Sequence, residues 1–126
     1  MQAEARFAAM DLLATLAESE HGRAAVARVR TLPRIIAAAL AHAARTPHDH
    51  AAAEVAAAAA RVAAASLLCR DGRAAAKARG RPMLEAASAL RASIDAAKSV
   101  MEPEALATLP TPQALKALER DLASLV

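Results

Sequence analysis

Alanine fills 41 of the 126 positions, and this excess restricts what the chain can fold into more than any other feature. Alanine is the strongest intrinsic helix former, whereas the β-branched and aromatic residues that favour strands are scarce. Phe7 is the only aromatic residue among Phe, Trp and Tyr, and the chain contains no Asn. We therefore expect an all-α protein. Because alanine buries little apolar area, the helices should approach closely and gain dispersion contacts.

Apolar residues recur at three- and four-residue steps along most of the chain, as on one face of a helix. The pattern predicts a single domain. We expect long helices at 3–18, 31–45, 47–69, 83–101 and 112–126, and short helices at 23–29 and 71–79. Thr46 is expected to cap the helix that begins at Pro47, with Asp49 as its acidic third residue. Thr111 is expected to cap the last helix, after a connector with one helical turn.

One short segment occurs twice: EHGRAAVARV at 20–29 returns fifty residues later as RDGRAAAKAR at 70–79. Two of the three glycines stand in this shared Gly-Arg-Ala-Ala context. Each copy follows a long predicted helix, forms a short one and precedes another long apolar helix. The same offset aligns Ala37 with Ala87 and Leu40 with Leu90. The agreement in residue identity and in the order of the predicted helices indicates an internal repeat.

The segments LLATLAESEHGRAAVARVRTLPRIIAAAL (12–40) and DHAAAEVAAAAARVAAASLLCRDGRAAAKARGRPMLEAASAL (49–90) resemble armadillo repeats. Such repeats place a short first helix after a long third helix, and their second helix begins near a Leu-Pro. The resemblance implies a short right-handed α-solenoid of about two repeats with a C-terminal capping helix. Its parts would be an N-terminal helix (1–19), a first repeat (20–69), a partial second repeat (70–100) and a connector with the C-terminal helix (101–126). Peptide-binding family members use Asn and Trp ladders, and this chain has neither residue.

Catalytic motifs are missing from the sequence. It contains no glycine-rich phosphate loop, no Gly-x-Ser-x-Gly elbow and no plausible Cys/His pair, so we expect no enzymatic activity and no cofactor. His42, His48 and His50 cluster around Asp49, but a fourth metal ligand is lacking. A solvated loop is the favoured interpretation of this cluster. A metal site and a polar contact with a partner are the alternatives.

Cys69 is the only cysteine, which excludes an internal disulfide and suits an intracellular, reducing compartment. Its neighbours predict a buried thiol within a helix. The N-terminal residues include Glu4 and Asp11, which argue against a secretory signal, and no apolar run is long enough to span a membrane. The cytoplasm is the favoured location. An organelle is the alternative if a leader sequence has been removed.

Positive charge is concentrated in the centre of the chain: residues 20–81 hold eleven Lys or Arg against four Asp or Glu. In stacked repeats these cations would lie along one edge, which we call the basic edge. It could be a solvated helix face, or it could bind an acidic protein surface or, less favourably, nucleic acid. No aromatic residue accompanies the cations to stack on a base. The residues of the basic edge are Arg23, Arg28, Arg30, Arg34, Arg73, Lys77, Arg79 and Arg81.

Stacked repeats bury their faces only against neighbours, and about three are normally needed for stability. Two repeats with a cap should therefore associate with other subunits or with themselves. The sequence predicts a non-catalytic interaction or scaffold module, a small structural or accessory subunit of a larger assembly. The alternative is a basic helical adaptor for RNA or another polyanion. Candidate docking residues lie on the apolar faces of the two end helices: Phe7, Met10, Leu118, Leu122 and Leu125.

Overall fold

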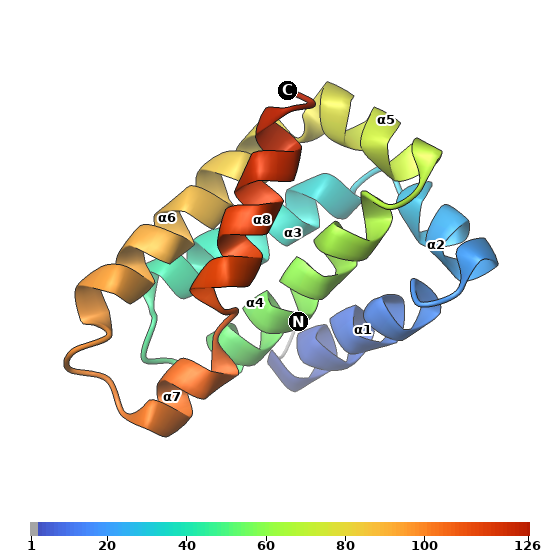
Figure 1. Cartoon of the computed structure of the whole chain (residues 1–126). Coiled ribbons are helices and arrows are strands. Elements are labelled where there is room, and N and C mark those ends of the chain that lie inside the picture. The colour runs from blue at the N-terminus through green and yellow to red at the C-terminus, as the bar shows by residue number, and fades with distance from the viewer. Residues whose placement is uncertain (1–2) are drawn as a thin grey trace.

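The structure, a computed structural model, describes residues 3–126. In this part of the chain the backbone forms helices and no strand, which confirms the all-α prediction (Figure 1). The helices in chain order are α1 (Ala3–Leu16), α2 (Glu20–Ala27), α3 (Leu32–Arg45), α4 (His50–Ser66), α5 (Arg70–Arg79), α6 (Arg81–Ala97), α7 (Pro103–Thr108) and α8 (Pro112–Ala123).

Helix α4 lies at the centre of the molecule, with α1 and α3 packed along it and α2, α5, α7 and α8 in smaller contacts (Figure 1). Ten of its seventeen residues are buried, and seven of these are alanines. A helix can be surrounded in this way because alanine side chains let neighbouring backbones approach closely. Larger fully buried side chains lie on α3, α6 and α8, and they include Ile36, Leu40, Leu90, Leu115 and Leu122.

Helices fifty residues apart pack against each other. Helix α1 packs on α4, α2 lies beside α5, and α3 makes the most extensive contact of the molecule with α6. The buried register follows the same offset, because Ala37 and Leu40 of α3 and Ala87 and Leu90 of α6 are all buried. Helix α3 also packs on α4, and α6 packs on α8. Helices separated by fifty residues therefore lie side by side in the described part of the chain.

The α3–α4 connection differs from the prediction. Thr46 ends α3 instead of starting α4, and its hydroxyl donates to the carbonyl of His42 at 2.8 Å. Asp49 is the N-cap of α4, and its carboxylate accepts from the backbone N–H groups of Ala51 and Ala52 at 3.0 and 3.3 Å. A carboxylate that satisfies two orphan donors at the positive end of a helix is the stronger cap. The predicted cap at Thr111 is confirmed, because its hydroxyl accepts from the N–H of Ala114.

Candidate functional site: two repeated junctions and an open groove

The two Gly-Arg-Ala-Ala segments form two junctions of the same construction, one between α1 and α2 and one between α4 and α5. Ser19 is the N-cap of α2, and its hydroxyl accepts from the N–H of Gly22 at 3.0 Å. Cys69 is the N-cap of α5, and its sulfur accepts from the N–H of Gly72 at 3.4 Å. Each capping side chain also lies 3.3 Å from the carbonyl oxygen three residues earlier. The equivalence of Ser19 and Cys69 was missed in the sequence, although both stand three residues before a shared glycine.

Glycine is required at both junctions because the new helix starts directly against the backbone of the preceding one. A Cβ atom on Gly22 would lie 2.0 Å from the carbonyl oxygen of Leu16, and one on Gly72 would lie 1.7 Å from that of Ser66. Both distances are far below a van der Waals contact. The repeated glycine is therefore explained by close approach, since neither residue has a positive φ.

The repeated arginine turns back onto the end of the preceding helix. Arg23 donates through Nε to the carbonyl of Ala17 at 3.1 Å, and Arg73 donates through Nη1 to the carbonyl of Leu67 at 3.3 Å. These carbonyls belong to the helix ends, where no intrahelical donor is available. Arg23 and Arg73, two of the eight basic-edge residues, therefore make hydrogen bonds that stabilise helix ends.

Cys69 lies at a helix junction, whereas the sequence predicted a buried thiol within a helix. Its side chain is half-buried and unpaired with another cysteine. Helix α4 ends at Ser66 instead of continuing to Cys69, because the close approach at Gly72 turns the chain at this point. The cysteine occupies the capping position that serine holds at the first junction.

The basic edge is partly assembled by the packing of α2 beside α5 (Figure 1). Arg28 Nε lies 3.4 Å from Asp71 Oδ2, and Arg79 donates to the backbone carbonyl of Arg30 at 3.3 Å. Both contacts link the two repeated segments on the surface of the molecule. The side chains of Arg34, Lys77 and Arg81 are exposed. The predicted segments 23–34 and 73–81 therefore do come together, although an acidic side chain interrupts the positive charge.

The predicted apolar ends are less exposed than expected. Met10, Leu118 and Leu122 are buried in the core of this chain, and Phe7 and Leu125 are partly buried against it. The end helices turn these side chains inward, where they bury apolar area against the rest of the core. Leu12, Leu16 and Ile35 are 60, 47 and 46 % exposed, and the other exposed large apolar residues among those described are Val29, Leu68, Val100 and Val126.

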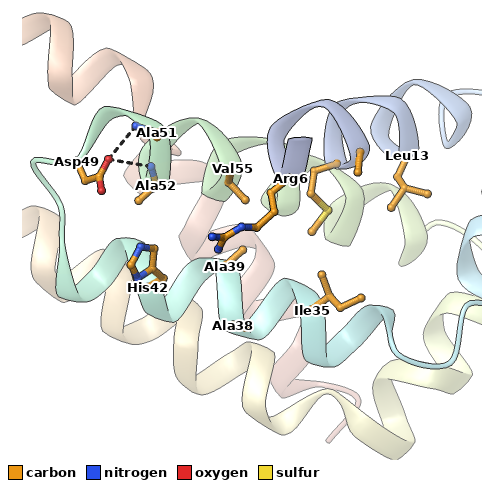
Figure 2. Close-up of a pocket in the computed structure, with 12 residues that line it drawn as sticks. Arg6, Leu13, Ile35, Ala38, Ala39, His42, Asp49, Ala51, Ala52 and Val55 are labelled. Atoms are coloured by element: carbon orange, nitrogen blue, oxygen red, sulfur yellow. Dashed lines mark hydrogen bonds between the residues drawn. The ribbon is translucent and has the colours of Figure 1, made fainter. Parts of the chain in front are cut away.

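A groove opens between α1 and α3, with the first turns of α4 as its floor (Figure 2). Its volume is about 540 Å³. Met10 and Leu13 line it from α1, Ile35 and Ala39 from α3, and Val55 from α4. The walls pack on α4 and not appreciably on each other. No motif pointed to this groove, because it results from the spacing of three helices.

Few polar groups line the groove. Arg6 extends from α1 towards Ala39 and His42 on α3 (Figure 2). Asp49 lies at the far end, and its carboxylate is directed to the start of α4. The groove is thus an apolar channel with two basic residues in its lining and one carboxylate that is already engaged.

The opposite end of the molecule is closed by α8, which packs on α6. Glu119 accepts from both Ser88 and Arg91, with Oε2 2.5 Å from Arg91 Nε, and its side chain is only 13 % exposed. The hydrogen bond from Arg91 holds the pKa of the Glu119 carboxyl below its usual value, against the opposing effect of burial. The polar network fixes α8 onto α6.

The histidine cluster is dispersed in the structure. His42 lines the groove, His50 Nε2 lies 3.2 Å from Glu54 Oε1, and His48 is exposed in the connection. Within residues 3–126, no three His, Cys, Asp or Glu side chains converge in a way that could hold a metal ion. Over the same residues, no single helix is both long and apolar enough to cross a membrane, and α4 and α5 reach that length only as a pair bent by 114°.

Comparison with known proteins identified no relative. No protein family matches the sequence, and no curated protein or solved structure is similar to the chain.

Proposed function

We propose that this chain is a non-catalytic protein–protein interaction module, a small accessory subunit that docks into a larger assembly. The observation that carries the proposal is the open apolar groove between α1 and α3, whose wall includes the exposed side chain of Ile35; Leu12 and Leu16 are further exposed apolar residues on α1. Contiguous apolar surface of this kind is typical of interaction sites. A neighbouring protein that covered it would remove it from water.

The proposed architecture is a short, right-handed, armadillo-like solenoid of about two repeats with α8 as its cap. The fifty-residue offset in caps, glycines, arginines and helix packing supports this interpretation. Helical repeat arrays need a polar outer face at each end to remain soluble. Helix α8 supplies such a face, because Gln113, Lys116 and Arg120 are exposed on it. The end formed by α1 and α3 carries the open apolar groove as well, which supports an assembly that continues on this side.

A site-specific photo-crosslinking experiment in the native cell tests the proposed function. A photoreactive amino acid at Ile35, in the groove wall, is expected to capture one defined protein in stoichiometric amount. The same group at Arg120, on the outer face of α8, serves as the matched control and should capture little. If neither these positions nor others spread over the surface yield a crosslinked partner, and the purified chain is a stable monomer, the interaction role is wrong.

The contact between α2 and α5 favours a second candidate, a basic adaptor for RNA or another polyanion. It brings the arginines of both repeated segments to one edge. Binding of this type falls steeply with salt, because each phosphate contact releases counterions. Replacing Arg28, Arg30, Arg79 and Arg81 with Glu should abolish RNA binding in a filter assay and leave assembly with protein partners intact. If the amount of RNA retained on the filter does not change between 50 and 300 mM salt, binding through electrostatic contacts with phosphates is ruled out.

A further inference from the structure

The groove has a counterpart elsewhere in the molecule, and that counterpart is filled. Fifty residues along the chain, the helices that correspond to its walls α1 and α3 are α4 and α6. Helix α3 lies between α4 and α6 and packs against both (Figure 1). The groove between α1 and α3 is therefore the same kind of space with no helix of this chain in it.

We propose that this groove binds one amphipathic α-helix of a partner protein, which packs against α1 and α3 as α3 packs against α4 and α6. The partner helix carries a stripe of alanine and branched aliphatic residues at i, i+3, i+4 and i+7, and acidic residues on its flank. This inference rests on the proposed interaction function and specifies the partner's chemistry. Helix-in-groove recognition by an apolar stripe is a common mode of binding.

The shape and lining of the groove fit a helix. The apolar part of its lining consists of alanine, Met10, Leu13, Ile35 and Val55, so a helix could approach closely and bury aliphatic side chains against it. Helix α3 shows the pattern that fills the corresponding space. Its buried residues include Ile36, Ala37 and Leu40, and its fourteen residues span about 21 Å at 1.5 Å per residue.

The charges around the groove select an acidic partner. Arg34 and Arg45, both exposed, lie on α3 four and seven residues from the groove-lining residue Ala38, on the same side of that helix. Helix α3 contains no acidic residue. The one carboxylate at the groove, that of Asp49, accepts from two backbone N–H groups and offers little repulsion. Complementary charge at the rim of an interface mainly sets specificity and association rate.

Helix α3 itself supplies the probe. The probe is a fluorescent peptide of residues 31–46 that carries Arg34→Glu and Arg45→Glu, with a hydrocarbon staple between positions 38 and 42, opposite Leu40. The staple is needed because an isolated helix of this length is marginal in water. Two control peptides keep the staple. One retains both arginines, and the other carries Leu40→Asp, which breaks the apolar stripe.

Fluorescence anisotropy with the full chain measures the interaction. We expect saturable binding of the acidic peptide, and at least about tenfold weaker binding of both control peptides. The variant Ile35→Glu should weaken binding of the acidic peptide at least about tenfold, because it places a carboxylate in the groove wall. The matched control is Leu68→Glu, which changes an equally apolar side chain, 66 % exposed, away from the groove and should leave binding unchanged. Circular dichroism verifies that both variants fold.

Three results would overturn the proposal: no binding of the acidic peptide to the folded chain, equal loss of binding in both chain variants, or equal binding of the basic peptide. If the chain self-associates and Ile35→Glu abolishes this, the groove binds a second copy of the chain. That result would also overturn the proposal. The photo-crosslinking experiment distinguishes an error in the helix-binding proposal from an error in the proposed interaction function. A partner captured away from the groove, with none captured at Ile35, preserves the interaction role and removes the groove from it.

Discussion

The α1–α2 and α4–α5 junctions use the same set of contacts in two different surroundings. Both have a side-chain cap, a glycine pressed against a carbonyl, and an arginine returned to the end of the preceding helix. At the first junction Leu16 is exposed and Gly22 is half-buried, whereas at the second Ser66 and Gly72 are buried. We therefore expect one local pattern to have unequal energetic weight, because α4 is enclosed by neighbouring helices, whereas α1 lies at the end of the molecule.

The largest effect is expected from Gly72→Ala. The new methyl group would lie 1.7 Å from the carbonyl oxygen of Ser66, and the backbone that would have to move belongs to the buried helix α4. We expect the free energy of unfolding to fall by about 3 kcal/mol or more. Urea denaturation followed by circular dichroism measures this loss. Alanine is the better helix former, so a loss of this size cannot come from helix propensity.

A smaller loss is expected from Gly22→Ala, about 2 kcal/mol. The contact with Leu16 is almost as short, at 2.0 Å, but α1 lies at the end of the molecule and can move away. The same denaturation measurement should place this variant between the wild type and Gly72→Ala. If Gly22→Ala were as destabilising as Gly72→Ala, the two junctions would be equally rigid, and the distinction between end and centre would fail.

The end of the molecule formed by α8 and the end that carries the groove also differ in their polar contacts. The variant Glu119→Gln tests this difference. Fifty residues before Ser88 and Arg91, the partners of Glu119, the chain has Ala38 and Ala41, so the groove end has no such network. At pH 7 we expect a loss of about 1–2 kcal/mol, because a hydrogen bond to a charged group is weakened in a largely buried place.

The pH dependence of that loss has a definite sign. The folded-state pKa of Glu119 lies below its usual value of about 4.5, so its ionised form stabilises the fold above that pH. The contribution is lost as the pH falls below 4.5 and through the lowered pKa. Wild type and Glu119→Gln should therefore converge in stability as the pH falls through the lowered pKa of Glu119. A difference that stayed constant over the whole acidic range in which the chain is folded would show that the carboxylate charge has no part in holding α8.

Helix content and the repeated segment could be predicted from the sequence, because alanine excess and a shared Gly-Arg pair are local signals. The N-cap of α4 was wrongly placed at Thr46, because a threonine before a proline satisfies the same local rule as Asp49 and only the three-dimensional structure decides between them. Two other features depend on the distances between helices. They are the burial of Met10 and Leu122 in the core and the groove beside Ile35. Distances between helices are set by packing, and periodicity carries no information on them.

Ser19→Ala tests the cap of the first junction. It removes the oxygen that accepts from the N–H of Gly22, and it should cost about 1 kcal/mol, the usual value of a serine cap. The measurement is again the free energy of unfolding in urea. Thr111→Ala, which removes the equivalent cap of α8, is a matched control and should give a similar loss. A negligible effect of Ser19→Ala beside a normal effect of Thr111→Ala would mean that the glycine contact alone sets the start of α2.

The smallest effect is expected from Cys69→Ser, which gives the second junction the cap of the first. Sulfur is a weak acceptor, and its distance to the N–H of Gly72 is 3.4 Å, against 3.0 Å for the hydroxyl of Ser19. A serine should cap α5 slightly better, and we expect the free energy of unfolding to rise by a few tenths of a kcal/mol. Differential scanning calorimetry on both proteins under reducing conditions resolves a change of this size. If the variant were instead less stable by more than about 1 kcal/mol, the half-buried thiol would stabilise the junction by packing, and Cys69 and Ser19 would share a position without sharing a role.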